Sequence, residues 1–210
     1  MQTRPLGKNG PQLAVIGLGT WAIGGPWQWG WGPQNDADSI AAIRAALENG
    51  VNWIDTAPAY GLGHAEEIVA KALQDFRREE VFIATKCGLV WDDRGRVKIH
   101  LRPESIRKEV EDSLRRLQIE QIDLYQHHWP DPNTSLRDSW GEMVRLKQEG
   151  KVRHLGVCNY DAKLLAKCGK IHPVQSLQPP LSLVKRDYLD ETLPYCAENG
   201  IGVVAYSPLQ

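Results

Sequence analysis

Long apolar segments are missing from this sequence of 210 residues. No apolar run approaches the roughly 18 residues that would suggest a membrane span. The first residues, Met1 to Pro5, also lack the apolar core of a secretory signal. We therefore expect a cytoplasmic protein with no membrane partner.

The sequence has neither an excess of one charge nor a cysteine framework. Its 25 basic and 26 acidic residues give a formal net charge of −1, which does not suggest the basic face that nucleic-acid binding normally needs. The four cysteines (Cys87, Cys158, Cys168 and Cys196) are widely spaced and form no Cys-x-x-Cys pair. We interpret them as reduced thiols, and we expect no nucleic-acid partner, no disulfide framework and no metal site.

Hydrophobic residues make up 42% of the chain and charged residues 24%, which is ordinary for a globular protein, and the length suits a single domain over residues 1–210. The chain opens with two short extended pieces around an Asn-Gly hairpin signal at Asn9 and Gly10. Helical and extended patterns then alternate. We expect the hairpin strands at 3–6 and 12–15, further strands at 16–20, 51–55, 81–86, 122–126, 154–157, 174–177 and 202–206, and helices at 36–49, 64–76, 103–117, 135–149, 162–168 and 188–199.

A local echo indicates repeated βα units. Residues 48–51 (Glu-Asn-Gly-Val), 149–152 (Glu-Gly-Lys-Val) and 198–201 (Glu-Asn-Gly-Ile) each end a helix with glycine and lead into a strand. Such units build either an open doubly wound sheet or a (β/α)₈ barrel. Seven units fit the barrel better, because each half of an open sheet usually needs about three. The eighth unit is missing.

Four of the eight tryptophans (Trp21, Trp27, Trp29 and Trp31) crowd into one stretch rich in glycine and proline. Two interpretations have equal weight. The indoles pack a surface loop onto the body of the protein, or they form an aromatic wall around a small-molecule pocket.

Residues 17–22 (Gly-Leu-Gly-Thr-Trp-Ala) formally match the G-x-G-x-x-A fingerprint of dinucleotide-binding Rossmann units. In that fold the second glycine opens directly into a helix whose N-terminus receives the pyrophosphate. Here a loop of glycine, proline and tryptophan follows, and no acidic residue ends a strand about 20 positions later. We therefore reject the fingerprint.

Reactive side chains gather at the expected carboxyl ends of the strands, where a βα barrel places its chemistry. Taken singly, Asp55 and Lys86 suit a structural ion pair, His128 a buried core histidine and Tyr60 a loop residue. Their occurrence at consecutive strand ends favours a shared site instead. The ends read Asp55 with Tyr60, Lys86, His127-His128, Cys158-Asn159, Gln178 and Tyr206-Ser207.

Six segments, in order, resemble the hallmark segments of the aldo-keto reductases, and the resemblance runs from the hairpin to the last residue. They are Asp55-Thr56-Ala57 with Tyr60-Gly61, Ala84-Thr85-Lys86, residues 123–130 (Asp-Leu-Tyr-Gln-His-His-Trp-Pro), Gly156-Val157-Cys158-Asn159, Ser176-Leu177-Gln178, and residues 205–209 (Ala-Tyr-Ser-Pro-Leu). The resemblance implies an α/β fold, a (β/α)₈ TIM barrel whose base is capped by a hairpin over residues 1–15. It also implies an NAD(P)H-dependent oxidoreductase that reduces an aldehyde or ketone to an alcohol.

The family's catalytic tetrad maps onto Asp55, Tyr60, Lys86 and His128. We choose His128 over His127 because the family's histidine directly precedes Trp-Pro, and because neighbours on a strand point to opposite faces. Tyr60 would donate the proton, and a nearby Lys86 ammonium would lower its pKa from the ordinary value of about 10. Asp55 would hold Lys86, and His128 would orient the carbonyl group.

The resemblance also implies a cofactor site and a substrate pocket. Cys158, Asn159 and Gln178 would contact the nicotinamide carboxamide, and Tyr206 would stack on its ring. Cys158 departs from the family's commoner serine, so a weak thiol hydrogen bond replaces a hydroxyl one. The implied cofactor is NADPH, with NADH not excluded; the full cofactor set is Gly19, Thr20, Trp21, Asp55, Cys158, Asn159, Gln178, Tyr206, Ser207 and Leu209, and the substrate-pocket set is Trp27, Trp29 and Trp129.

The family usually continues beyond residues 206–209, so we expect a barrel truncated after its seventh strand, with two exposed edge strands. Two other functions stay open. The chain is a catalytically inactive truncated member or a binding subunit with the reductase fold, or it is an unrelated barrel such as an isomerase or aldolase that uses Lys86 as a Schiff-base amine.

Overall fold

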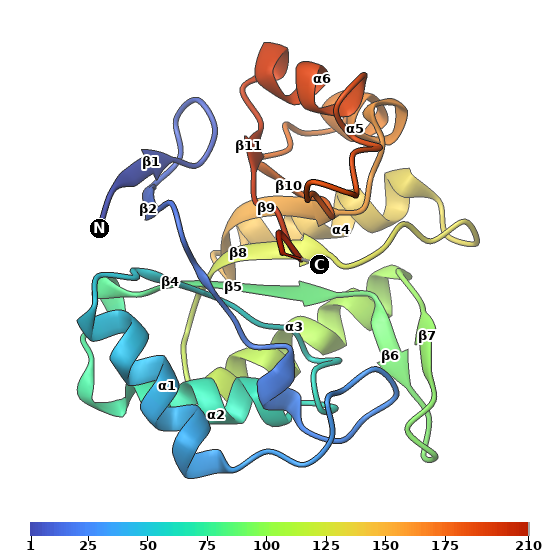
Figure 1. Ribbon diagram of the computed structural model, residues 1–210. Helices are drawn as coiled ribbons and strands as arrows, with labels where there is room; N and C mark the ends of the chain where they lie inside the picture. Colours follow the sequence, from blue (N-terminus) through green and yellow to red (C-terminus); the bar gives the residue numbers. More distant parts are fainter. Residues whose placement is uncertain (210) are drawn as a thin grey trace.

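A computed structural model describes residues 1–209 of the chain. An N-terminal antiparallel hairpin precedes a series of strands and helices that alternate along the chain (Figure 1). The strands are β1 (Thr3–Pro5), β2 (Gln12–Ala14), β3 (Leu18–Gly19), β4 (Trp53–Asp55), β5 (Phe82–Cys87), β6 (Leu89–Trp91), β7 (Val97–Ile99), β8 (Ile122–His127), β9 (Val152–Cys158), β10 (Ser176–Gln178) and β11 (Gly202–Val203). The helices are α1 (Asp36–Glu48), α2 (His64–Ala72), α3 (Pro103–Leu117), α4 (Leu136–Gln148), α5 (Ala162–Gly169) and α6 (Thr192–Asn199), with short 3₁₀ turns η1 (Ala22–Gly24), η2 (Leu73–Asp75) and η3 (Arg78–Glu80).

Seven strands form one parallel sheet in the order β11-β10-β9-β8-β5-β4-β3. One helix lies between each pair of strands that follow one another in this sheet, and the helices lie outside it as it curls (Figure 1). This is the (β/α)₈ barrel arrangement through its seventh strand, as expected from the seven repeated units. The Rossmann alternative is excluded because β3 leads into the 3₁₀ turn η1 rather than into a long helix.

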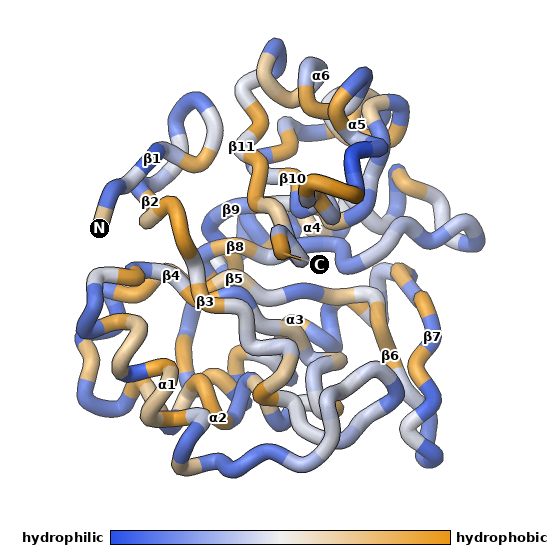
Figure 2. Tube along the Cα trace, in the orientation of Figure 1, coloured by the Kyte–Doolittle hydropathy of each residue, from blue (hydrophilic) through white to orange (hydrophobic). Residues whose placement is uncertain are grey.

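Helix α3 shows how the sequence specifies these elements. Pro103 occupies the first turn, where a missing N–H costs nothing, and Gln118 ends the helix in a left-handed conformation. Ile106, Val110 and Leu117 form a buried stripe toward the sheet. The same division is visible along the chain, with apolar segments on the strands and polar segments on the outer loops (Figure 2).

Several boundaries differ from the expectation. The hairpin β6–β7 was not anticipated, because its short strands follow directly on β5. Helix α6 begins at Thr192 rather than at residue 188, and α2 ends at Ala72, where the 3₁₀ turn η2 takes over. Ser135 stands at the N-cap of α4 but makes no capping hydrogen bond through its side chain.

The last strand also stops early, at Val203 rather than at residue 206. Val204 donates its N–H to Leu177, and Tyr206 donates to Pro179, so the chain continues alongside β10. Pro179 and its neighbour Pro180 have no N–H to return, which interrupts the regular ladder. Tyr206 is thereby kept close to the end of β10.

Apolar residues pack on both faces of the sheet, in its curled interior and on its helical side. The hairpin packs Leu6, Leu13 and Ala14 against Trp53 and Leu124, which lie inside the curled sheet. A larger core fills the space between the sheet and the helices. Among residues 1–209 no helix is both long and apolar enough to cross a membrane.

Candidate active site at the carboxyl ends of the strands

Lys86 is the centre of the site, and its side chain has no exposed surface. Its register places it two residues beyond the position opposite Asp55, at the carboxyl ends of β4 and β5. The ammonium Nζ donates to Asp55 Oδ2 at 2.8 Å and to the Thr56 carbonyl at 2.8 Å, and it lies 3.1 Å from Tyr60 Oη. A buried ammonium is tolerated only with such partners.

The charge state of Lys86 follows from these contacts. Burial acts to lower its pKa, but the negative charge and hydrogen bond of Asp55, together with the electrostatic effects of Tyr60 and Cys158, raise the pKa of Lys86 above its usual range. The group is therefore a fixed ammonium at neutral pH. A Schiff-base mechanism needs a neutral amine, so the geometry counts against the isomerase or aldolase alternative.

The Tyr60 hydroxyl contacts this ammonium, and the Lys86 Nζ also lies 4.8 Å from the centre of the Tyr60 ring. Burial raises the pKa of Tyr60 to about 12, although Lys86 acts in the opposite direction. The expected direction of the Lys86 effect is thus present, but the expected net lowering of the Tyr60 pKa is not, because desolvation outweighs it. Tyr60 holds its proton at neutral pH.

The two adjacent histidines have different surroundings. His127 points to the helical side, where its Nδ1 lies 3.0 Å from Tyr160 Oη and its ring packs edge-on against Trp140. His128 lies on the other side, with its ring centre 5.7 Å from that of Tyr60. Burial, together with the Lys86 charge, lowers the pKa of His128 well below its ordinary value, so this imidazole is neutral.

The ends of β9 and β10 are connected to the same cluster. Gln178 donates from Nε2 to Asp55 Oδ1 at 2.9 Å, and the Cys158 thiol lies 3.7 Å from Gln178 Oε1. Burial raises the pKa of Cys158, so the thiol keeps its proton and is the donor of that contact. A hydrogen-bonded path therefore runs from Cys158 through Gln178 and Asp55 to Lys86.

Asn159 adopts a left-handed backbone conformation, with φ of 63°. Its side chain donates to the His128 carbonyl at 3.0 Å and accepts from the Tyr206 hydroxyl at 2.9 Å. The three residues are thus joined around the mouth of the curled sheet, which is the edge formed by the carboxyl ends of its strands.

The remaining cofactor candidates divide into two groups. Gly19 and Thr20 lie beside Asp55: Gly19 is opposite it in the β3–β4 register, and Thr20 bonds to the Asp55 carbonyl. Trp21 is partly exposed and packs edge-on against Trp31. Ser207 and Leu209 are exposed and make no hydrogen bond or ion pair with the cluster within residues 1–209.

The tryptophan loop contributes one residue to the site. The Trp27 ring centre lies 6.0 Å from that of Tyr60, and Trp29 packs edge-on against Trp27 at 5.5 Å. Trp129 is 41% exposed and shares no ring contact with Tyr60 in the described part of the chain. The loop therefore borders the site through Trp27, while its other indoles face outward.

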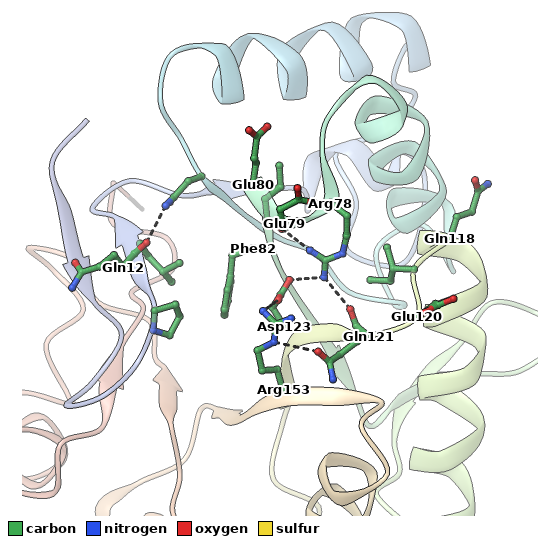
Figure 3. Close-up of a pocket in the computed structure, with 15 residues that line it drawn as sticks. Gln12, Arg78, Glu79, Glu80, Phe82, Gln118, Glu120, Gln121, Asp123 and Arg153 are labelled. Atoms are coloured by element: carbon green, nitrogen blue, oxygen red, sulfur yellow. Dashed lines mark hydrogen bonds and ion pairs between the residues drawn. The ribbon is translucent and has the colours of Figure 1, made fainter.

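A cavity of about 560 Å³ lies elsewhere, at the opposite end of the strands beside the hairpin. Figure 3 shows that Arg78 and Arg153 converge there on Asp123. The cavity contains none of the expected site residues.

Sequence reasoning missed two sets of residues at the active end. The Thr56 carbonyl, a Lys86 partner, carries no side-chain signal of its own. A cluster of Glu66, Thr85 and the partly buried Arg116 adjoins the loop that follows Tyr60. Its signal is a charged residue in the first turn of a helix that is otherwise apolar on that face.

Comparisons with known proteins identify the family that the chain resembles. Residues 15–210 match the model of the aldo/keto reductase family. The chain is 40% identical over 210 residues to the aldo-keto reductase YhdN of Bacillus subtilis; the match covers the whole of this chain and 62% of that relative. It is also 40% identical over 225 residues to the NADH-specific methylglyoxal reductase of Escherichia coli, where the match covers the whole of this chain and 68% of the relative. It superposes with a TM-score of 0.86 and 44% identity on the glycerol dehydrogenase AKR11B4 from Gluconobacter oxydans, covering 97% of this chain and 62% of that one.

Proposed function

The chain belongs to the aldo/keto reductase family, and from this premise we propose that it reduces an aldehyde or ketone to an alcohol with a nicotinamide cofactor. Tyr60 is the proton donor in this proposal. The observation that carries it is the Lys86 ammonium, which bonds to Asp55 and lies 3.1 Å from the Tyr60 hydroxyl. Because the chain spans 62% of the length of its relative YhdN, the activity of the whole protein is part of the proposal.

The residues at the mouth fit a nicotinamide group. Its carboxamide needs both a donor and an acceptor, and the side-chain amides of Gln178 and Asn159 supply both at neighbouring strand ends. A side chain at Gly19 would meet no atom within 4 Å, so open space lies beside Asp55. Tyr206, joined to Asn159, offers an aromatic face next to these amides.

A nicotinamide cofactor, when bound there, would supply hydride for the carbonyl carbon. Tyr60 gives its proton to the carbonyl oxygen, which gains negative charge as the carbon is reduced. The Lys86 ammonium stabilises the tyrosinate that remains, and Asp55 keeps the ammonium within reach. Neutral His128 donates an N–H to the same oxygen and orients it.

The high pKa of Tyr60 suits the role of a proton donor. A donor with a pKa of about 12 is fully protonated at neutral pH, so the acid is always ready. The carbonyl oxygen becomes a strong base only as the hydride arrives, which supplies the driving force for proton transfer.

The cofactor is NADPH or NADH, and two considerations oppose each other. The family resemblance points to NADPH, whereas the relative from Escherichia coli is named as NADH-specific. A direct comparison of the two cofactors decides this point. The substrate in the proposal is a small carbonyl compound bordered by Trp27.

The test measures binding and turnover separately. Tryptophan fluorescence of the 210-residue chain is titrated with NADPH and NADH, and loss of nicotinamide absorbance is then followed with methylglyoxal as the probe substrate. Saturable quenching with turnover that disappears in Tyr60→Phe supports the proposal. Quenching without turnover favours the alternative of a binding subunit, and a Tyr60→Phe variant that keeps most of its turnover excludes Tyr60 as the donor.

A further inference from the structure

The loop that follows Tyr60 has an unusual backbone. Gly61, Leu62 and Gly63 have φ values of 65°, 56° and 108°, so three consecutive residues are in the left-handed region. A leucine in this region is disfavoured by its own side chain. Neighbouring parts of the molecule must therefore hold the loop, and with it the position of the tyrosine.

One side of the loop rests on the backbone of the tryptophan-rich segment. A side chain added at Gly24 would come within 2.6 Å of the Gly61 nitrogen, and one added at Gly61 would come within 2.0 Å of the Gly24 carbonyl oxygen. The two glycines are thus in direct backbone contact. This contact limits movement of the loop in one direction only.

The other side rests on Arg116, in the last turn of α3. A side chain added at Gly63 would lie 2.9 Å from Arg116 Cδ and 3.2 Å from its Nε. The Gly63 backbone therefore packs directly on the side chain of the arginine. The loop is enclosed between Gly24 and Arg116.

Arg116 is itself fixed by a buried carboxylate. Its Nε donates to Glu66 Oε2 at 2.7 Å, and Glu66, which has no exposed surface, accepts a 2.7 Å hydrogen bond from Thr85 on its other oxygen. Thr85 directly precedes Lys86 on β5. The strand that carries the ammonium and the loop that carries the phenol are therefore connected through one ion pair.

We propose that the ion pair between Arg116 and the buried Glu66, anchored on Thr85, is a positioning element that holds Tyr60 against Lys86. The inference rests on the proposed function, because it concerns the placement of the proton donor. Its geometry does not depend on which reaction the site performs. The competing explanation is that the pair only joins α2 to α3.

The decisive experiment observes Tyr60 directly. Tyrosine is labelled with ¹³C at Cζ, the Tyr60 resonance is identified by its absence in Tyr60→Phe, and the signal is followed from pH 7 to 11 in the native chain and in Arg116→Met. With a native pKa of about 12, roughly one tenth of Tyr60 is tyrosinate at pH 11. A Tyr60 released from Lys86 and from burial titrates near 10 and is about nine tenths tyrosinate at that pH.

Arg107→Met is the matched control. Arg107 lies on the same helix and pairs with Glu142, whose side chain is also nearly buried, at 2.6 Å. It makes no hydrogen bond or ion pair with the Tyr60 loop in residues 1–209; its other partner is Glu149, at 2.8 Å. We expect this control to weaken the fold while the Tyr60 resonance stays native, and Arg116→Lys to restore part of the native signal.

A folded Arg116→Met chain with a native Tyr60 titration would overturn the proposal. If that variant does not fold, Thr85→Val decides, because it replaces the hydroxyl that anchors Glu66 with a methyl group of similar size. We expect a displaced Tyr60 resonance, and an unchanged one would overturn the proposal. The readout needs no turnover. Failure of the proposed function, seen as full activity in Tyr60→Phe, is therefore distinguishable from failure of this inference.

Discussion

Both ends of the parallel sheet hold a buried carboxylate on cationic side chains, but only one end is suited to chemistry. At the mouth, Asp55 pairs with Lys86 at 2.8 Å. At the base, Asp123, whose side chain is 3% exposed, pairs with Arg78 at 2.5 Å and Arg153 at 3.0 Å (Figure 3). In the proposed function, the same charges thus serve two different purposes in one sheet.

The difference lies in where the remaining hydrogen bonds go. At the base, Asp123 also accepts the Ile83 N–H, and Arg78 donates onward to the carbonyls of Val81 and Gln121, so all these contacts end on fixed groups. At the mouth, the contacts of Lys86 include the Tyr60 hydroxyl, which can release a proton. A buried ion pair becomes reactive when one of its contacts is a titratable group beside open space.

Removal of that titratable group should have the largest effect. We expect Tyr60→Phe to lower turnover by about 10²- to 10⁴-fold, or about 3–5 kcal/mol of barrier, because a positioned acid contributes this much. The free energy of unfolding should change by less than about 1.5 kcal/mol, the net value of one hydrogen bond. Steady-state kinetics and urea unfolding measure the two quantities, with Tyr195→Phe on α6 as the control.

The opposite pattern is expected at the base. Asp123→Ala leaves two arginines and a backbone N–H without their acceptor, and we expect a loss of about 2 kcal/mol in the free energy of unfolding, since the half-exposed arginines recover hydration. Turnover per folded molecule should stay native. A fall in turnover comparable to that of Tyr60→Phe would show that the two ends are coupled and would break the comparison.

Glu109 sharpens the comparison because it is a buried carboxylate without a contacting cation. It accepts hydrogen bonds from the Gly88 N–H at 2.8 Å and from Ser105 at 3.0 Å. Burial raises the pKa of Glu109 from 4.5 to about 7. The unfolded chain therefore loses this proton first, and the contribution of Glu109 to stability is full below about pH 4.5 and is lost as the pH rises to about 7.

Glu109→Gln should remove this dependence, since glutamine is neutral at every pH. Relative to the native chain, we expect the variant to gain about 2–3 kcal/mol in the free energy of unfolding between pH 5 and pH 8. Urea unfolding of both chains at the two pH values measures the difference. An equal difference at both pH values would mean that the native Glu109 titrates like an exposed carboxyl group.

The sequence predicted the fold, and the tetrad residues that it named lie together at the mouth, whereas it named none of the contacts at the base. Glycine stops, apolar strands and amphipathic helices are local signals, and α3 appears within its expected bounds, residues 103–117. Asp55, Lys86 and His128 could be found because strand ends meet at one edge of a parallel sheet. Asp123 lies at the start of a strand and belongs to the same segment as His128, yet nothing local revealed its two arginine partners.

Other features depend on packing that no local pattern reports. The net pKa of Tyr60 is set by burial between Trp27, Lys86 and His128, so charge alone gave the wrong net direction. The role of Arg116 depends on Gly63, which lies 53 positions earlier in the chain and is in contact with it only in the folded state. Hairpin β6–β7 was not predicted because strands of three residues carry almost no periodicity.

The smallest effect is expected at Cys158, which adjusts the mouth without carrying charge. Its thiol is a weak donor to Gln178 Oε1 at 3.7 Å, and a hydroxyl at that place is a stronger donor to an amide. We expect Cys158→Ser to tighten cofactor binding by about two- to five-fold, or about 0.5–1 kcal/mol, and Cys158→Ala to weaken it slightly. Fluorescence titration with NADPH and NADH measures both variants. Equal weakening in the serine and alanine variants would mean that the size of the sulfur atom matters rather than its proton. The hydrogen-bonded path to Lys86 would then stop at Gln178 and would not include Cys158.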